Sequence, residues 1–277
     1  MTSLFISILH APWIPGRRAM VIRNKRRLQE ELRGRRDCKL VVVEDKLREG
    51  VVEMTAKCYR HAYMSGMTHH LFLQDDVFVC KNFVDSVLSL IDALPERSAL
   101  SLWTGAAQAD VCKRRGQHWL RGYGLSGNLA FVTRSEESLA LAQWISAAHY
   151  QLSQIPPKGL KKGFGAKHAE DDLRDLYLRS SGVPTYVALP CLVTHGAGGG
   201  VLHDSHFATT ERSNSFPFRW ESWATGDAED VIEELLSSVG EVCDVTYNPY
   251  LDKIKQAIHW KLQGILAQAE EVAAKNG

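Results

Sequence analysis

The chain has 277 residues, of which 45% are hydrophobic and 23% are charged, with 33 Lys and Arg against 32 Asp and Glu. This composition is ordinary for a globular α/β protein, and the length suits one large domain or a domain with an appendage. A net charge of +1 excludes a global field that would select nucleic acid or a membrane, so any charged binding surface has to be local.

The first part of the chain alternates between strand and helix patterns. Strands are predicted over 4–11, 38–46 and 69–77, and helices over 17–36 and 51–65. Such alternation predicts an α/β fold whose mostly parallel sheet is flanked by crossover helices.

The pattern continues to about residue 195 and then changes. Further helices are predicted over 83–94, 135–152 and 169–182, further strands over 99–105, 129–134 and 185–195, and a Gly-, Pro- and Lys-rich loop over 155–168. Two helices, over 227–239 and 249–275, follow the last strand. We therefore expect a domain over 1–222 and a helical C-terminal appendage over 223–277.

Cysteine usage and hydropathy bear on where the protein is found. The six cysteines form no CxxC pair, and no apolar run approaches the length needed to cross a bilayer. We expect a cytoplasmic protein without a transmembrane segment, in the host cytoplasm if the protein is viral.

Polar residues stand at the ends of the first three predicted strands. They are His10, Glu44 with Asp45, and Asp75 with Asp76. Ligands of such sheets bind beyond the carboxyl ends of the strands, and paired carboxylates there can hold a divalent cation that in turn holds a diphosphate. The alternative for the two adjacent aspartates is that they simply face water.

Two later motifs carry possible chemistry. The segment Ala169–Asp172 (AEDD) opens a predicted helix, where its acids either favour the helix macrodipole or take a proton from an acceptor hydroxyl. His195 ends the last predicted strand and precedes GAGGG, which suits metal binding and a close backbone approach to phosphate. A structural role is the alternative for this histidine.

Taken in order, these features resemble the nucleotide-sugar glycosyltransferases of the GT-A fold. The loop HAPWIPGRR stands where that family contacts the nucleotide, LQDDV stands in the place of its Asp-x-Asp motif, and AEDD and VTH match its acidic motif and late histidine. The family motif has acids at its first and third positions, whereas this chain has Gln74, Asp75 and Asp76. Asp76 then becomes the main metal ligand, and Asp75 contacts the ribose or a metal-bound water.

The resemblance implies a metal-dependent transfer of a hexose or pentose from a nucleoside-diphosphate sugar, expected to be a UDP-sugar, with Mn²⁺ or Mg²⁺. It implies metal ligation by Asp76 and His195. It implies a general base among Glu170, Asp171 and Asp172 if the anomeric configuration inverts. It implies donor contacts from His10, Ala11, Pro12, Arg17, Glu44, Asp45, Gln74 and Asp75.

Basic and aromatic residues gather in several segments and suggest an acceptor. Candidate acceptor-binding residues are Trp119, Arg121, Lys161, Lys162 and His203. Together with the basic stretch 17–36 they suit a polyanion whose bases can stack, and in character the chain resembles bacteriophage-type DNA glycosyltransferases that modify hydroxymethylcytosine and related bases. The alternative acceptor is a bacterial glycan or lipopolysaccharide. A nucleotidyltransferase or a non-catalytic DNA-binding module is the alternative from another class.

Overall fold

Apolar runs in the first part of the chain fold as neighbouring parallel strands. The structure is a computed structural model that describes residues 2–103, 114–122, 129–153, 169–188, 191–195 and 242–244. Strand β1 (Leu4–His10) is buried along its whole length and pairs in parallel with β2 (Cys38–Glu44) and β3 (His69–Gln74). Because these strands run the same way, their carboxyl ends share one edge of the sheet.

The main sheet has, within the described ranges, eight strands in the order β10-β6-β8-β5-β7-β3-β1-β2. The remaining members are β5 (Ala99–Ser101), β6 (Trp119–Gly122), β7 (Ala130–Arg134), β8 (Thr185–Ala188) and β10 (Val242–Asp244). Four neighbouring pairs among them are parallel (β1–β2, β1–β3, β5–β8 and β10–β6), and the other three are antiparallel.

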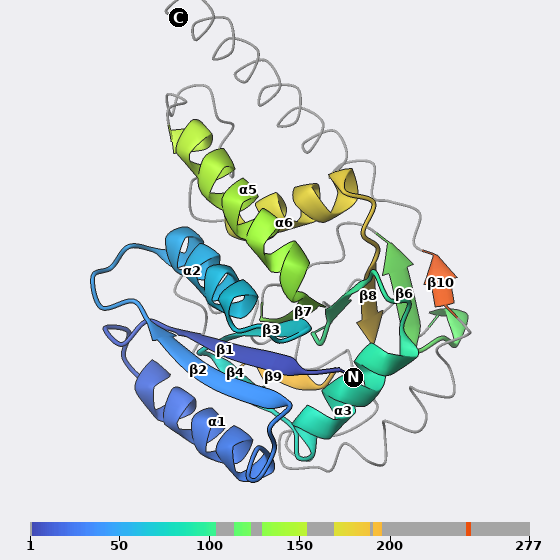
Figure 1. Cartoon of the computed structure of the whole chain (residues 1–277), viewed down its shortest axis with the longest axis horizontal. Coiled ribbons are helices and arrows are strands. Elements are labelled where there is room, and N and C mark those ends of the chain that lie inside the picture. The colour runs from blue at the N-terminus through green and yellow to red at the C-terminus, as the bar shows by residue number, and fades with distance from the viewer. Residues whose placement is uncertain are drawn as a thin grey trace, which may run out of the picture.

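Helices cover both faces of this sheet (Figure 1). Helices α1 (Arg17–Glu31) and α3 (Phe83–Ala93) lie on one face, and α2 (Val51–Met64), α5 (Ser135–Ser153) and α6 (Ala169–Ser180) lie on the other. Alternate residues of β1 serve the two layers, since Ile6 and Ile8 join the cluster on the α1 face while Leu9 packs with Met54 of α2. The predicted α/β fold, with a mostly parallel sheet flanked by helices, is confirmed.

A second, two-stranded sheet stands beside the main one and corrects two predicted strands. The run 69–77 divides into β3 and β4 (Val77–Val79), with Asp75 and Asp76 in the turn between them. The run 185–195 divides into β8, in the main sheet, and β9 (Val193–His195), which pairs with β4. The sequence between β8 and β9 contains Pro190, and a proline cannot donate a ladder hydrogen bond.

Two strands and several predicted segments complete the comparison with the sequence. β6 and β10 were not predicted, because the first lies in a basic segment and the second lies between two helical patterns. β10 belongs to the predicted appendage over 223–277 and pairs in parallel with β6. The predicted loop over 155–168 and the helices over 227–239 and 249–275 lie outside the described residues, so the domain boundary stays a prediction.

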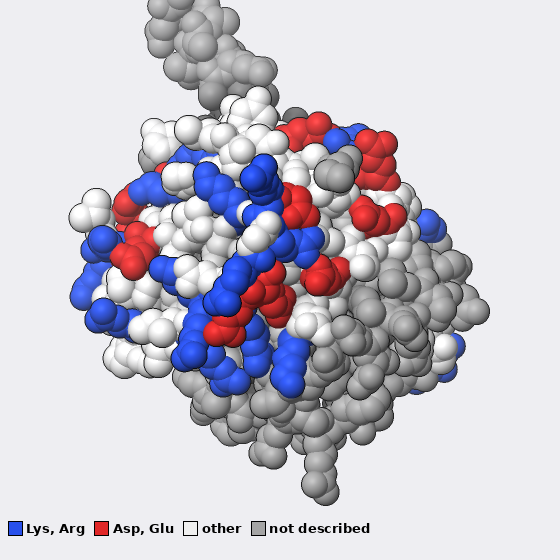
Figure 2. Space-filling model, turned by 60° about the horizontal axis from the view of Figure 1, so that its bottom comes forward, with Lys and Arg blue, Asp and Glu red and all other residues white. Residues whose placement is uncertain are grey.

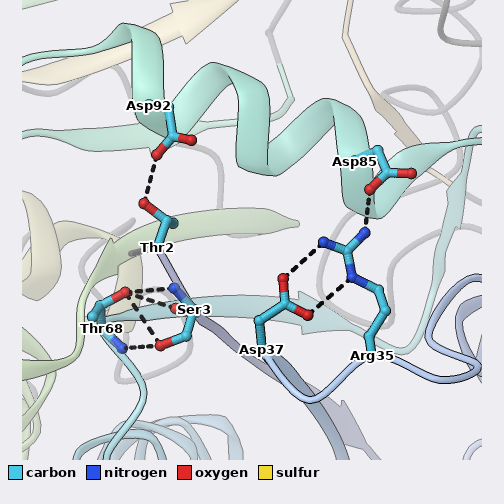
Figure 3. Close-up of polar contacts among 7 residues, drawn as sticks. All are labelled: Thr2, Ser3, Arg35, Asp37, Thr68, Asp85 and Asp92. Atoms are coloured by element: carbon cyan, nitrogen blue, oxygen red, sulfur yellow. Dashed lines mark hydrogen bonds and ion pairs between the residues drawn. The ribbon is translucent and has the colours of Figure 1, made fainter.

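Polar contacts tie the opposite, amino edge of the sheet (Figure 3). Arg35 donates two hydrogen bonds to Asp37, at 2.8 and 3.1 Å, and a further one to Asp85 of α3. Ser3 and Thr68 exchange hydrogen bonds through backbone N–H and hydroxyl groups at 2.8 and 2.9 Å. These contacts join the α1–β2 turn to α3 and the start of β1 to the start of β3.

No helix in the described part of the chain combines the length and the apolar character that crossing a membrane requires.

Candidate functional site

The carboxyl ends of β1, β2 and β3 come together at one edge of the main sheet, as their polar ends predict. In the sheet register His10 stands opposite Glu44, and Leu9 stands opposite Gln74. Just past the strands, the backbone N–H of Asp45 donates to the carbonyl of His10 at 2.7 Å. We call the region beyond these three strand ends the carboxyl edge.

Asp75 is the junction of the carboxyl edge. Its Oδ2 lies 2.9 Å from His10 Nδ1 and accepts the backbone N–H of Ala11 at 2.8 Å, while its Oδ1 accepts a hydrogen bond from Arg17. An ionised carboxylate only accepts, so His10 Nδ1 carries the proton in this contact. The side chain is 6% exposed, and it links the end of β3 to the end of β1 and to the start of α1.

Arg17 bridges Asp75 and Asp76, which we call the aspartate pair. Its Nη1 lies 2.8 Å from Asp76 Oδ2 in addition to its contact with Asp75, and its side chain is 11% exposed. Gly16 precedes it with φ 82, a left-handed conformation that glycine adopts without strain, and so turns the loop into the first residue of α1. Two adjacent buried carboxylates repel each other, and the guanidinium offsets that repulsion.

Helix α1 also holds strand β4 directly behind the aspartate pair. Asn24 Nδ2 donates to the carbonyl of Val77 and Arg27 Nη1 donates to the carbonyl of Val79, both at 2.6 Å. The guanidinium of Arg23 lies 4.6 Å from the centre of the Phe78 ring. Strand β4 therefore lies between the side chains of α1 and strand β9.

The sequence interpretation did not single out Asn24 or Arg27. A signal for Asn24 was present, because it is a buried polar residue between Val21 and Leu28 on the apolar face of the helix. No comparable signal marks Arg27.

The pairing of β4 with β9 brings His195 beside the aspartate pair. Val77, the residue after Asp76, is the register partner of His195 in this antiparallel pair. Residues opposite each other in such a pair have Cα atoms about 5 Å apart. The two residues predicted as metal ligands are thus neighbours across the small sheet, His195 being placed here through its backbone.

Carboxylate oxygens and an imidazole are a donor set that suits Mn²⁺. In the described part of the chain, no three side chains of His, Cys, Asp and Glu are grouped so as to hold a metal ion by themselves.

Asp45 shapes the loop between β2 and α2. Its buried carboxylate accepts the backbone N–H groups of Glu49 and Gly50 at 2.8 and 3.2 Å. Glu44, the last residue of β2, is exposed and forms an ion pair with Lys46 at 3.1 Å. Of these two predicted donor contacts, Glu44 is open to solvent and Asp45 holds the loop in place.

An exposed aromatic side chain stands at the same edge. Trp13 is 41% exposed, and its Nε1 donates to the carbonyl of Asp45 at 3.0 Å. The guanidinium of Arg48, a residue with φ 58, lies 5.4 Å from the centre of the Trp13 ring. Of the remaining predicted donor contacts, Pro12 is exposed, while Ala11 and Gln74 are half-buried.

The acids of AEDD lie in the first turn of α6. Glu170, Asp171 and Asp172 occupy successive positions there, just before Leu173. Leu173 is buried in a cluster with Val52, from the first turn of α2, and its carbonyl accepts a hydrogen bond from Trp144 at 3.1 Å. Helix α2 begins just beyond the carboxyl end of β2, so α6 begins on the side of the sheet that holds the carboxyl edge.

The predicted acceptor residues are not brought together. Trp119 is 0% exposed and belongs to the largest core cluster, so its indole is not on a surface open to an acceptor. Arg121 lies in β6 and is exposed. Lys161, Lys162 and His203 lie outside the described residues.

Exposed cations gather along α1 and the turn after it, a surface that we call the basic face. Its exposed members are Arg18, Arg23, Lys25, Arg26, Arg33 and Arg36. Figure 2 brings this side of the molecule forward and shows Lys and Arg side chains crowded over it, with acidic side chains between them. The basic face begins one residue after Arg17, so it adjoins the carboxyl edge.

Comparison with known proteins gives distant structural likenesses. No protein-family model matches the sequence, and no curated protein matches it. A glycosyltransferase involved in the glycosylation of the major capsid of PBCV-1 is 14% identical, with a TM-score of 0.44 over 72% of this chain and 94% of that chain.

Two further solved structures show weaker likeness. A Drosophila β1,4-galactosyltransferase 7 mutant in complex with manganese, UDP-Gal and xylobiose is 10% identical, with a TM-score of 0.39 over 80% of each chain. A CMP:2-keto-3-deoxy-manno-octonic acid synthetase in complex with CTP is 11% identical, with a TM-score of 0.37 over 67% of this chain and 89% of that one. At these scores, function is inferred below from the residues of this chain alone.

Proposed function

We propose that the chain is a nucleotide-sugar glycosyltransferase that binds the diphosphate of a UDP-sugar at the carboxyl edge. The carrying observation is the buried aspartate pair, bridged by Arg17, whose next residue pairs with His195. Carboxylates, a guanidinium and an imidazole at the carboxyl ends of parallel strands form a site for a diphosphate and its cation.

Asp76 and His195 are the residues that would hold Mn²⁺ or Mg²⁺ in this proposal. When bound, the cation would supply positive charge against the diphosphate leaving group. Asp75 has a supporting role, because its contacts with His10, Ala11 and Arg17 fix the ends of three elements around the site.

The reaction would transfer the sugar to an acceptor hydroxyl. The hydroxyl oxygen forms a bond to the anomeric carbon, and the bond from that carbon to the diphosphate oxygen breaks, with its electron pair leaving on UDP. If the anomeric configuration inverts, a carboxylate among Glu170, Asp171 and Asp172 takes the hydroxyl proton. Arg17 is placed to bind an oxygen of the departing diphosphate.

For the acceptor we propose a 5-hydroxymethylpyrimidine of DNA. The support is the basic face, which continues from the donor site along α1 and offers guanidinium and ammonium groups to a phosphate backbone. A base in a duplex would have to leave the stack for its hydroxymethyl group to reach the anomeric carbon. A glycan acceptor is the other outcome of the experiment below.

The experiment is a turnover assay with a panel of nucleotide sugars and Mn²⁺, with and without DNA containing hydroxymethylcytosine. We expect UDP release and sugar on the DNA from the wild type, and a loss of on the order of a hundredfold or more in Asp76→Asn, since the removed charge acts on the leaving group. Asp92→Asn, an exposed change of the same kind in α3, is the matched control and should keep full activity.

Three outcomes separate the possibilities. Sugar on the DNA that depends on Asp76 supports both the donor and the acceptor proposals. UDP release that ignores the DNA supports the transferase and moves the acceptor to a glycan. Absence of turnover with every donor, in a protein that is folded by circular dichroism, would refute the transferase proposal.

A further inference from the structure

Arg17 already occupies the carboxylates that the proposed metal would need. Its Nη1 contacts Asp75 Oδ1 and also lies 2.8 Å from Asp76 Oδ2, and all three side chains are nearly buried. A guanidinium stays protonated in proteins, so it cannot leave this position by losing its charge. It can leave only by moving to another anion.

The formal charges make the competition explicit. With two aspartates and one arginine, the cluster carries −1, and a divalent cation added beside an unmoved Arg17 would bring it to +1 in a nearly buried place. A buried excess of positive charge is costly, so binding of the cation alone is opposed. A nucleoside diphosphate changes the balance, because it brings negative charge and bidentate acceptors that match a guanidinium.

We propose that Arg17 is a built-in counter-ion that holds the aspartate pair until the donor arrives, and that it then transfers to the diphosphate as the divalent cation takes Asp76. This inference rests on the proposed function and adds an order to it. The wild type binds Mn²⁺ weakly by itself and binds it together with UDP. The same reciprocity requires Mn²⁺ to raise the affinity for UDP by the factor by which UDP raises the affinity for Mn²⁺.

The anchoring of Asp75 makes such an exchange possible without loosening the edge. When Arg17 moves away, Asp75 keeps its contacts with His10 Nδ1 at 2.9 Å and with the backbone N–H of Ala11 at 2.8 Å. Arg17 is the first residue of α1, so its side chain can turn while the helix stays bound to β4 through Asn24 and Arg27.

The test measures Mn²⁺ binding without nucleotide, by the electron paramagnetic resonance signal of free Mn²⁺. We expect Arg17→Gln to bind Mn²⁺ at least tenfold more tightly than the wild type, because the competing charge is gone. Arg17→Lys keeps one charge but cannot offer a planar fork to two carboxylates, and its gain should be smaller. Arg97→Gln is the control, since it removes an arginine from another carboxylate pair, with Glu137, and should not change Mn²⁺ affinity.

A second titration with UDP present completes the test. In the wild type UDP should raise Mn²⁺ affinity by a larger factor than in Arg17→Gln, where the counter-ion is absent. If Arg17→Gln fails to fold, Arg17→Lys against the wild type carries the comparison.

Failure of this inference and failure of the proposed function look different. If neither Arg17 variant binds Mn²⁺ more tightly than the wild type while the wild type still turns over a nucleotide sugar, the counter-ion role is refuted and the transferase stands. If the variants gain Mn²⁺ affinity and no donor is turned over, the counter-ion role is supported and the transferase falls.

Discussion

At the scale of single residues, the same carboxylate serves the fold and the site. Asp75 holds the end of β1 through His10 and Ala11 and orients Arg17, whereas its neighbour Asp76 contacts Arg17 and precedes the partner of His195. The sequence predicts that acids at a strand end face a charged group. It does not predict that the group includes an arginine of this same chain, because that arginine comes from another element.

His70 shows the opposite case of a histidine that belongs to the core. It is 0% exposed, its Nε2 lies 2.7 Å from Ser7 Oγ, and the Tyr59 ring meets it edge-on at 5.0 Å. Burial lowers the pKa of His70 from 6.5 to about 3. The imidazole is therefore neutral in the folded protein at physiological pH.

This pKa makes folding stability depend on pH in a defined direction. The folded pKa lies below the unfolded one, so between them the unfolded chain binds a proton that the folded chain does not, and stability falls as pH falls from 6.5 to about 3. Between about pH 7.5 and about pH 5, this one group should cost the wild type about 2 kcal/mol of unfolding free energy.

His70→Gln keeps a donor and an acceptor but does not titrate. Urea unfolding at both pH values should show a smaller pH-dependent loss in this variant than in the wild type. Equal losses in the two proteins would mean that His70 is protonated in the folded state.

At the scale of elements, helix α1 positions the strand that follows the aspartate pair. Asn24 donates to the carbonyl of Val77 at 2.6 Å, and Val77 pairs with His195 on its other side. The helix therefore acts on the site through backbone hydrogen bonds as well as through Arg17.

Replacement of Asn24 by Leu should loosen β4. The change leaves the buried carbonyl of Val77 without its donor and should lower the free energy of unfolding by about 1 to 3 kcal/mol. Hydrogen exchange of the β4–β9 amides should accelerate more than that of β1. Gln29→Leu, an exposed change on the same helix, should leave both measurements within about 0.5 kcal/mol of the wild type. Unchanged exchange in Asn24→Leu would show that α1 does not hold β4.

Elements whose periodicity is strong were predictable from the sequence, and those set by distant partners were not. The alternation from β1 to β3 follows from buried apolar runs and amphipathic helices. The separation of β8 from β9 was missed, because one continuous apolar run serves two different sheets. β10 was missed because its three residues gain their structure only by pairing with β6.

At the scale of the whole molecule, the sheet separates a binding edge from a structural edge. Loops at the amino edge are joined by Arg35, Asp37 and Asp85, and the proposed site lies at the carboxyl edge (Figures 1 and 3). Although the net charge of the chain is only +1, the basic face concentrates cations next to the site. A nearly neutral protein can therefore present a local surface for a polyanion.

The basic face should give DNA binding a measurable salt dependence. The double variant Lys25→Gln/Arg33→Gln should weaken DNA binding and reduce the slope of log affinity against log salt by about 2, one for each lost phosphate contact. The matched control, Arg60→Gln/Arg97→Gln, removes two charges that pair with Glu53 and Glu137 and should keep the slope. Fluorescence anisotropy with a short duplex provides the measurement. Equal slopes in the two variants would rule out the basic face as the DNA surface.

The central claim is that the carboxyl edge binds a divalent cation with a nucleoside diphosphate, and anomalous diffraction from a crystal grown with UDP and Mn²⁺ tests it most directly. The account predicts an anomalous peak at bonding distance from the Asp76 carboxylate, a diphosphate beside it, and Arg17 on a phosphate oxygen. Mn²⁺ and UDP bound elsewhere, with Arg17 still bridging Asp75 and Asp76, would contradict it.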